Sequence, residues 1–107
     1  IAAVAGRERV IVGLTYHGGT LLGPGRVKHP GHGVTHLGEL SGEVTPRLKA
    51  VDAALREAGF ETTLSTRILD EVWKKLALNC CTLPTSALLR FFANELVGYP
   101  TAKDAMA

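Results

Sequence analysis

The spacing of hydrophobic residues changes along the chain, and the change falls near Thr66. Before Thr66, short runs of apolar and β-branched residues predict strands at 10–16, 26–29, 34–40 and 60–65. The glycine-rich segment 17–25 and the segment 30–33 predict a loop and a turn, so the strands at 26–29 and 34–40 should pair as a hairpin. Residues 1–5 predict the tail of a helix that stops at Gly6.

A helix is also predicted inside this first part. Thr45 is a suitable N-cap residue, Pro46 suits the first helical position, and Gly59 is a typical stop. The apolar residues expected to face the core are Leu48, Val51, Leu55 and Ala58.

From Thr66 onward the pattern is helical throughout. It predicts one helix from about Arg67 to about Cys81 and a second over residues 85–94, opened by Pro84. The predicted fold class is therefore α/β followed by all-α, with a boundary near Thr66.

One polar pair stands out in the predicted central helix. Lys75 and Asn79 are four residues apart, so their side chains should lie one turn apart on the same face. Such a pair could hold a small oxygen-rich molecule, although a solvated lysine and a polar asparagine near a helix end is the simpler alternative. Apolar residues expected to pack this helix are Ile68, Leu69, Val72, Trp73, Leu76 and Cys80.

Composition excludes several classes of function. The 107 residues carry a net charge of +2, from 12 basic and 10 acidic residues, without a basic run that would predict nucleic-acid binding. No apolar run approaches the length of roughly 18 residues expected of a membrane span. Cys80 and Cys81 are adjacent and suit neither a disulfide framework nor a metal site, so we expect reduced cysteines with Cys80 buried.

Two other motifs have simple interpretations. The glycines at 31, 33 and 38 lack the spacing of a dinucleotide fingerprint and are better explained as turn residues. The histidines at 17, 29, 32 and 36 lie in a turn-rich region without supporting Cys or carboxylate ligands, so no metal site is predicted.

The pattern Trp73-x-Lys75-Leu76-x-x-Asn79 resembles the signature of the ketopantoate reductases (2-dehydropantoate 2-reductases). Two upstream stretches are also similar to that family: residues 13–19, which read Gly-Leu-Thr-Tyr-His-Gly-Gly, and residues 23–40, with their glycines at 23, 25, 31, 33 and 38 and the closing Gly-Glu-Leu. The resemblance extends over nearly the whole chain, from about Val10 to Leu96.

The resemblance implies an NADP(H)-dependent reduction of a small 2-keto acid. It assigns Lys75 as the catalytic general acid and Asn79 as a substrate-binding residue, while Lys74 would face solvent. Gly18 and Gly19 match the small pair that approaches the nicotinamide in that family, although ordinary turn glycines explain them equally well.

Two positions depart from the family pattern. Leu83 and Ala93 stand where the family carries asparagines, so two polar contacts to the substrate would be missing. A substrate with fewer polar groups than ketopantoate is therefore possible.

The resemblance also divides the chain. Residues 1–66 would form the C-terminal portion of a Rossmann-type NADP-binding domain, and residues 67–107 the start of a C-terminal helical substrate domain. We expect an internal fragment of a cytoplasmic enzyme of pantothenate biosynthesis, a possible homodimer, that is inactive without its other parts. The alternative is a truncated, catalytically inactive remnant or interaction module without a nucleotide site.

Overall fold

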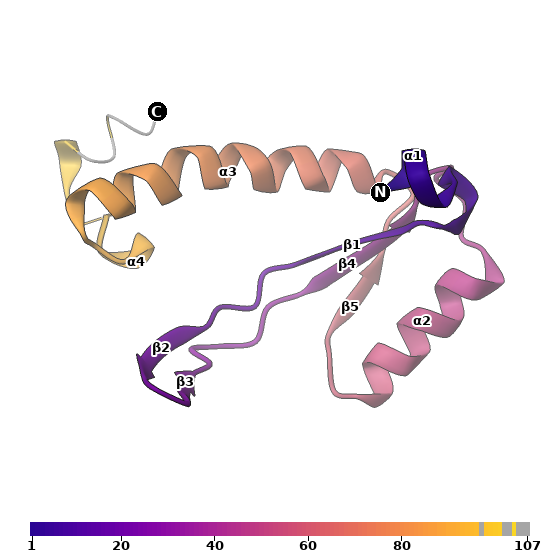
Figure 1. Ribbon diagram of the computed structural model, residues 1–107, viewed down its shortest axis with the longest axis horizontal. Helices are drawn as coiled ribbons and strands as arrows, with labels where there is room; N and C mark the ends of the chain where they lie inside the picture. The colour runs from indigo at the N-terminus through magenta and orange to yellow at the C-terminus, as the bar shows by residue number, and fades with distance from the viewer. Residues whose placement is uncertain (97, 102–103, 105–107) are drawn as a thin grey trace. The chain divides into compact units, whose positions relative to one another are not determined.

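The computed structural model describes residues 1–96, 98–101 and 104, without the side chains of Ala93 and Asn94, and it divides into two compact units (Figure 1). The first unit is Ile1–Glu71 and the second is Val72–Ala107. The assignment of residues 1–66 and 67–107 to two functional domains remains a prediction.

A three-stranded mixed sheet forms the centre of the first unit. Its strands are β1 (Ile11–Thr15), β4 (Thr35–Glu39) and β5 (Thr62–Leu64), in the order β1-β4-β5. β1 runs antiparallel to β4, whereas β5 runs parallel to it. A short helix, α1 (Ala2–Ala5), and a 3₁₀ turn, η1 (Arg7–Arg9), precede β1, so helical structure within residues 1–5 and its end at Gly6 are as predicted.

The predicted pairing of residues 26–29 with residues 34–40 is wrong. β3 (Arg26–Lys28) pairs with β2 (Thr20–Gly23), and β2 lies inside the segment predicted as a loop. β4 pairs with β1. The cause is the turn Pro24-Gly25, in which Gly25 has a φ of 70°. Proline followed by glycine at positive φ is typical of a type II turn, which reverses the chain directly into β3.

Helix α2 (Pro46–Glu57) begins as predicted. The Leu48 amide donates to the Thr45 hydroxyl at 3.2 Å, and the Leu48 side chain is fully buried. The predicted inward stripe is wrong at its other end, because Val51 and Ala58 are exposed. α2 packs on β4 and β5, and a sheet of three short strands covers only part of the helix.

The buried apolar residues of the first unit lie between the sheet and the helices. They are Leu14, Leu37, Leu48 and Ile68. Gly38 permits the closest approach, because a Cβ there would lie 2.5 Å from the Ile68 Cβ and 2.6 Å from the Ser65 carbonyl oxygen. A side chain at position 38 would therefore displace the first turn of the next helix.

That next helix, α3 (Ile68–Leu89), is continuous through Pro84, so the predicted break into two helices is wrong. A proline inside a helix removes one hydrogen bond and crowds the preceding turn. Two threonines next to Pro84 bond the neighbouring turn: Thr82 Oγ1 donates to the Leu78 carbonyl and Thr85 Oγ1 to the Cys81 carbonyl, each at 2.8 Å. After α3, Arg90 has a φ of 56° and the chain turns into α4 (Ala93–Leu96).

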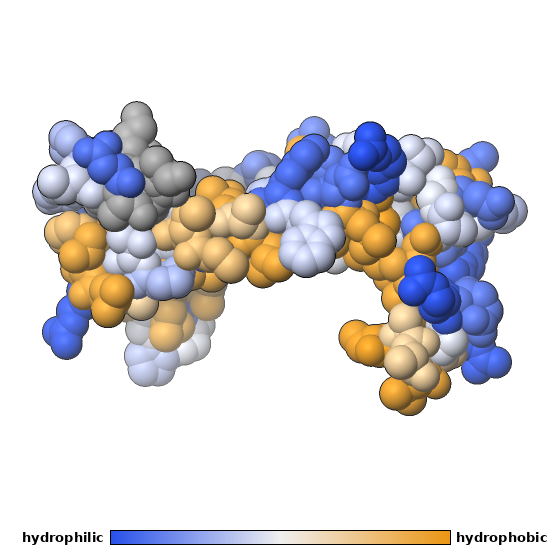
Figure 2. Space-filling view, turned by 90° about the horizontal axis from the view of Figure 1, so that it is seen from above, coloured by the Kyte–Doolittle hydropathy of each residue, from blue (hydrophilic) through white to orange (hydrophobic). Residues whose placement is uncertain are grey.

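One face of α3 exposes large apolar side chains. Trp73 is 68% exposed and Leu83 57% exposed, and Cys80 is exposed rather than buried as predicted. Figure 2 shows several hydrophobic residues at the surface, and α3 is among the elements that carry them. Both cysteines are free thiols. None of the described helices has the length and apolar character that crossing a membrane requires.

Candidate functional site

Lys75 and Asn79 both lie on α3, in the second unit, as the sequence predicted. Both side chains are half-buried, whereas the neighbouring Lys74 is exposed. Each helical residue advances by about 100°, so residues four apart lie about 40° from each other on one face. An ammonium and an amide are therefore presented side by side, while Lys74 points away from them.

Two further polar residues share that face. Thr82 and Ser86 follow Asn79 at spacings of three and four residues and are also half-buried. All four side chains fall within about 60° of one another around the helix. We call Lys75, Asn79, Thr82 and Ser86 the α3 polar row. The alternating spacing of four, three and four residues could have revealed Thr82 and Ser86 from the sequence. The family signature includes only Lys75 and Asn79.

The hydrogen-bonding groups of the α3 polar row change from donors at Lys75 to an acceptor at Thr82. Lys75 supplies donors only, and Asn79 supplies both donors and an acceptor. Thr82 has committed its proton to the Leu78 carbonyl, so its oxygen is left as an acceptor. The Ser86 hydroxyl oxygen is buried and has no hydrogen-bond partner among the described residues.

Gly18 and Gly19 lie in the first unit, between β1 and β2, and both are exposed. A Cβ at Gly18 would lie 3.3 Å from the Pro30 Cγ, which is tight, whereas one at Gly19 would lie 3.7 Å from the Val27 Cγ1, an ordinary contact. Neither glycine has a positive φ. Their exposed backbone leaves room for a ligand to approach, and their assignment to the cofactor remains a prediction.

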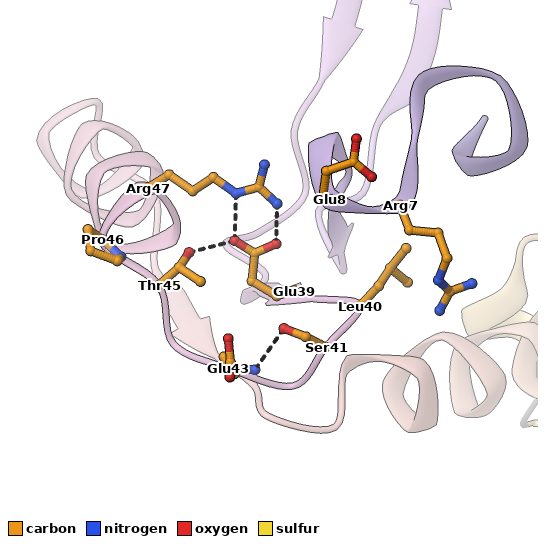
Figure 3. Close-up of a pocket in the computed structure, with 9 residues that line it drawn as sticks. All are labelled: Arg7, Glu8, Glu39, Leu40, Ser41, Glu43, Thr45, Pro46 and Arg47. Atoms are coloured by element: carbon orange, nitrogen blue, oxygen red, sulfur yellow. Dashed lines mark hydrogen bonds and ion pairs between the residues drawn. The ribbon is translucent and has the colours of Figure 1, made fainter.

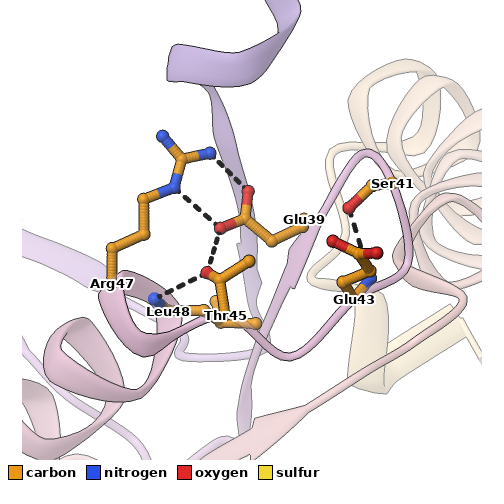
Figure 4. Close-up of polar contacts among 6 residues, drawn as sticks. All are labelled: Glu39, Ser41, Glu43, Thr45, Arg47 and Leu48. Atoms are coloured by element: carbon orange, nitrogen blue, oxygen red, sulfur yellow. Dashed lines mark hydrogen bonds and ion pairs between the residues drawn. The ribbon is translucent and has the colours of Figure 1, made fainter.

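A second polar cluster lies in the first unit, where a cavity of about 770 Å³ opens between η1, the end of β4 and the start of α2 (Figure 3). The Glu39 side chain is only 4% exposed. Arg47 donates to it through Nε at 2.8 Å and through Nη2 at 2.5 Å, and the Thr45 hydroxyl donates at 2.5 Å (Figure 4). We call Glu39, Thr45 and Arg47 the Glu39 cluster.

The bonds within the Glu39 cluster lower the pKa of Glu39 from 4.5 to about 2. Hydrogen bonds from Arg47 are the main cause, followed by the bond from Thr45, and both outweigh the cost of burial. Glu39 in turn raises the pKa of Arg47. The carboxylate therefore stays ionised at neutral pH and is poorly suited to proton transfer, because its pKa is far from the working range.

The Glu39 cluster thus connects the end of β4 to the first turn of α2. A similar connection joins α2 to β5, where Asp52 accepts from Arg56 Nε at 3.0 Å and from the Thr62 hydroxyl. The bond from Thr62 is the main cause of the lowered pKa of Asp52, and Arg56 adds to it. Neither cluster follows from the sequence pattern, because the partners come from different elements or lie across a turn.

The histidines form ring contacts near the β2–β3 hairpin. His17 Nδ1 lies 3.0 Å from His29 Nε2, and the two rings are stacked. Over the part of the chain that the structure describes, no group of three or more His, Cys, Asp or Glu side chains is placed to hold a metal ion.

Comparison with known proteins supports the sequence resemblance. A profile of the family "Ketopantoate reductase PanE/ApbA" matches residues 1–42. The chain is 32% identical over 93 residues to a 2-dehydropantoate 2-reductase of Archaeoglobus fulgidus, a match that covers 87% of this chain and 32% of that protein. It is 34% identical over 99 residues to the corresponding protein of Halobacterium salinarum, covering 92% of this chain and 33% of that protein. The chain thus spans about a third of the length of these relatives.

Solved structures give the same result. A 2-dehydropantoate 2-reductase from Geobacter metallireducens is 28% identical and superposes with a TM-score of 0.83, over 98% of this chain and 35% of that one. One from Methylococcus capsulatus is 33% identical with a TM-score of 0.60, over 76% of this chain and 26% of that one. The predicted fold class, part of a Rossmann-type domain followed by helices, is confirmed. In both sequence and fold, the resemblance of this chain to the ketopantoate reductases is therefore confirmed.

Proposed function

We propose that the full-length protein carrying this chain reduces a 2-keto acid with NADPH, and that the acid is ketopantoate or a close analogue. The curated relatives, which carry the name 2-dehydropantoate 2-reductase, support this reaction class. The observation that carries the assignment to residues is the pairing of Lys75 with Asn79 on one half-buried face of α3.

Lys75 is proposed as the general acid. Reduction converts the keto carbon into an alcohol, and NADPH, when bound, supplies the hydride. Negative charge then develops on the keto oxygen, which needs a proton and a nearby positive charge. An ammonium group supplies both, so Lys75 would stabilise the developing alkoxide and then transfer its proton to that oxygen.

Asn79 is proposed to position the substrate one turn from Lys75. A neutral amide can donate to the carboxylate or keto oxygen without competing with the ammonium for negative charge. Its contact would be present in the ground state as well as in the transition state. Loss of the Asn79 amide should therefore raise KM more than it lowers kcat.

The proposed cofactor contact lies at Gly18 and Gly19. Their exposed backbone, without side chains, is compatible with close approach of a flat nicotinamide ring. The preference for NADPH over NADH is part of the proposal.

The proposal is tested by assaying the full-length protein for oxidation of NADPH and of NADH, in the presence of ketopantoate and of a panel of less polar 2-keto acids. We expect reduction of at least one 2-keto acid, with a higher kcat/KM for NADPH. A folded protein that reduces none of them would contradict the proposal. It would instead favour an interaction module, for which the exposed Trp73 and Leu83 on α3 provide an apolar surface.

A further inference from the structure

We propose that Thr82 is a third substrate-binding residue, whose hydroxyl oxygen accepts a hydrogen bond from a hydroxyl group of the 2-keto acid. This inference rests on the proposed function and extends it to substrate selection. It starts from the position of Thr82 on the half-buried face that also presents Lys75 and Asn79.

The hydrogen bonding of Thr82 determines which group it can recognise. Its Oγ1 donates to the Leu78 carbonyl oxygen at 2.8 Å, so the one hydroxyl proton is already used. The lone pairs of the oxygen stay available, and they can bind only a donor. Carboxylate and keto oxygens carry no proton to give, whereas an alcohol does. Thr82 therefore distinguishes a hydroxylated 2-keto acid from one without a hydroxyl group.

The spacing along α3 agrees with a small substrate. Asn79 and Thr82 are three residues apart, which corresponds to a rise of about 4.5 Å along the helix. A molecule that places its keto or carboxylate oxygens at Lys75 and Asn79 would extend toward Thr82 over only a few bonds. The donors at Lys75 and the acceptor at Thr82 thus orient the acid along α3, with its keto or carboxylate oxygens toward Lys75 and its hydroxyl group toward Thr82.

Thr85 provides a matched control within the same helix. Its hydroxyl makes the same kind of bond, to the Cys81 carbonyl and also at 2.8 Å, and it is likewise half-buried. It lies about 80° around the helix from Lys75, outside the α3 polar row. If these threonines only support the helix around Pro84, then replacing either one should have a similar effect.

The test compares ketopantoate with its analogue that lacks the hydroxyl group, using the full-length protein. In Thr82→Val, kcat/KM for ketopantoate should fall by about 2- to 13-fold, the range for one neutral hydrogen bond, while kcat/KM for the analogue stays unchanged. Thr82→Ser should restore the preference, and Thr85→Val should leave the ratio of the two substrates as in the unmodified protein. Circular dichroism melting of each variant separates a folding effect from a binding effect.

Three results would overturn the inference: no change of the substrate ratio in Thr82→Val, an equal loss for both acids, or the same loss in Thr85→Val. In each of them the unmodified protein still reduces 2-keto acids, so the proposed function survives. If the unmodified protein reduces neither acid, both the proposed function and the role of Thr82 are wrong.

Discussion

The Glu39 cluster and the α3 polar row both gather charged and polar side chains, but they use their hydrogen bonds differently. In the Glu39 cluster, the carboxylate accepts three bonds from Arg47 and Thr45, and Thr45 also accepts from the Leu48 amide. These bonds join a strand to a helix within one unit. In the α3 polar row, the residues lie along a single helix, and neighbouring helical turns present their side chains together.

A shifted pKa does not by itself mark a functional group in this protein. The pKa of Glu39 is lowered to about 2, yet the cause is a set of bonds that stabilise the fold. A strongly shifted group is a candidate for catalysis only when its pKa approaches the working pH. By this criterion the Glu39 cluster is structural. The candidate chemistry stays with Lys75 and Asn79 because of their shared position on one half-buried face of α3.

The largest effect on folding is expected for Leu48→Ala. Leu48 is fully buried at the start of α2, directly after the residues of the Glu39 cluster. Removing its side chain should lower the free energy of unfolding by about 2–5 kcal/mol, measured by urea denaturation. Leu88→Ala is the control, because Leu88 is 85% exposed on α3 and should change stability little. Equal losses in both variants would contradict the assigned core.

A smaller effect, on substrate selection, is expected for Leu83→Asn. Leu83 lies four residues beyond Asn79 and is 57% exposed. If it stands where ketopantoate reductases bind substrate through an amide, the asparagine should raise kcat/KM for ketopantoate by about 5- to 150-fold, since an unpaired polar group costs about 1–3 kcal/mol. Leu88→Asn places the same amide on another side of α3 and should have no such effect. A gain in Leu88→Asn alone would show that the wrong face of α3 was chosen.

A further effect, on stability, is expected for Glu39→Gln, and it should be fully present at neutral pH and shrink as the pH falls below 4.5. Folding lowers the pKa of Glu39 from 4.5 to about 2, so the carboxylate stabilises the fold above pH 4.5. This contribution is lost as the pH falls from 4.5 toward 2, because the unfolded chain binds the proton first. The unfolding free energy of the unmodified protein should therefore decrease across this window, and that of Glu39→Gln should decrease less. Parallel curves for the two proteins would show that Glu39 is not the group responsible.

Much of the fold could be predicted from local signals. Thr45 and Pro46 marked the start of α2, and the β-branched run before Tyr16 marked β1. The strand pairing could not be predicted, because β1 and β4 meet across an intervening hairpin, and the glycine-rich pattern around its turn at Pro24 and Gly25 predicts only a loop. The proline at position 84 predicts a helix start, whereas α3 runs through it, with the Thr82 and Thr85 hydroxyls bonded to carbonyls of the preceding turn.

The positions of Lys75 and Asn79 could be predicted from the sequence, whereas the Glu39 cluster could not. The position of Lys75 and Asn79 on one face follows from helical spacing alone, and the structure places both on α3. Their chemical roles came from the family resemblance and remain proposals. The Glu39 cluster could not be predicted, because no local pattern shows that Glu39, at the end of a strand, meets Arg47 in the following helix.

Steady-state kinetics of Lys75→Ala and Lys74→Ala in the full-length protein decide whether Lys75 protonates the substrate. Lys75→Ala should lower kcat by about 10²- to 10⁴-fold, the usual contribution of general acid catalysis. Lys74 is exposed and about 100° around the helix from Lys75, so Lys74→Ala should change kcat little. Circular dichroism should show both variants folded. A large loss in Lys74→Ala together with a mild one in Lys75→Ala would contradict the assignment of Lys75 as the general acid.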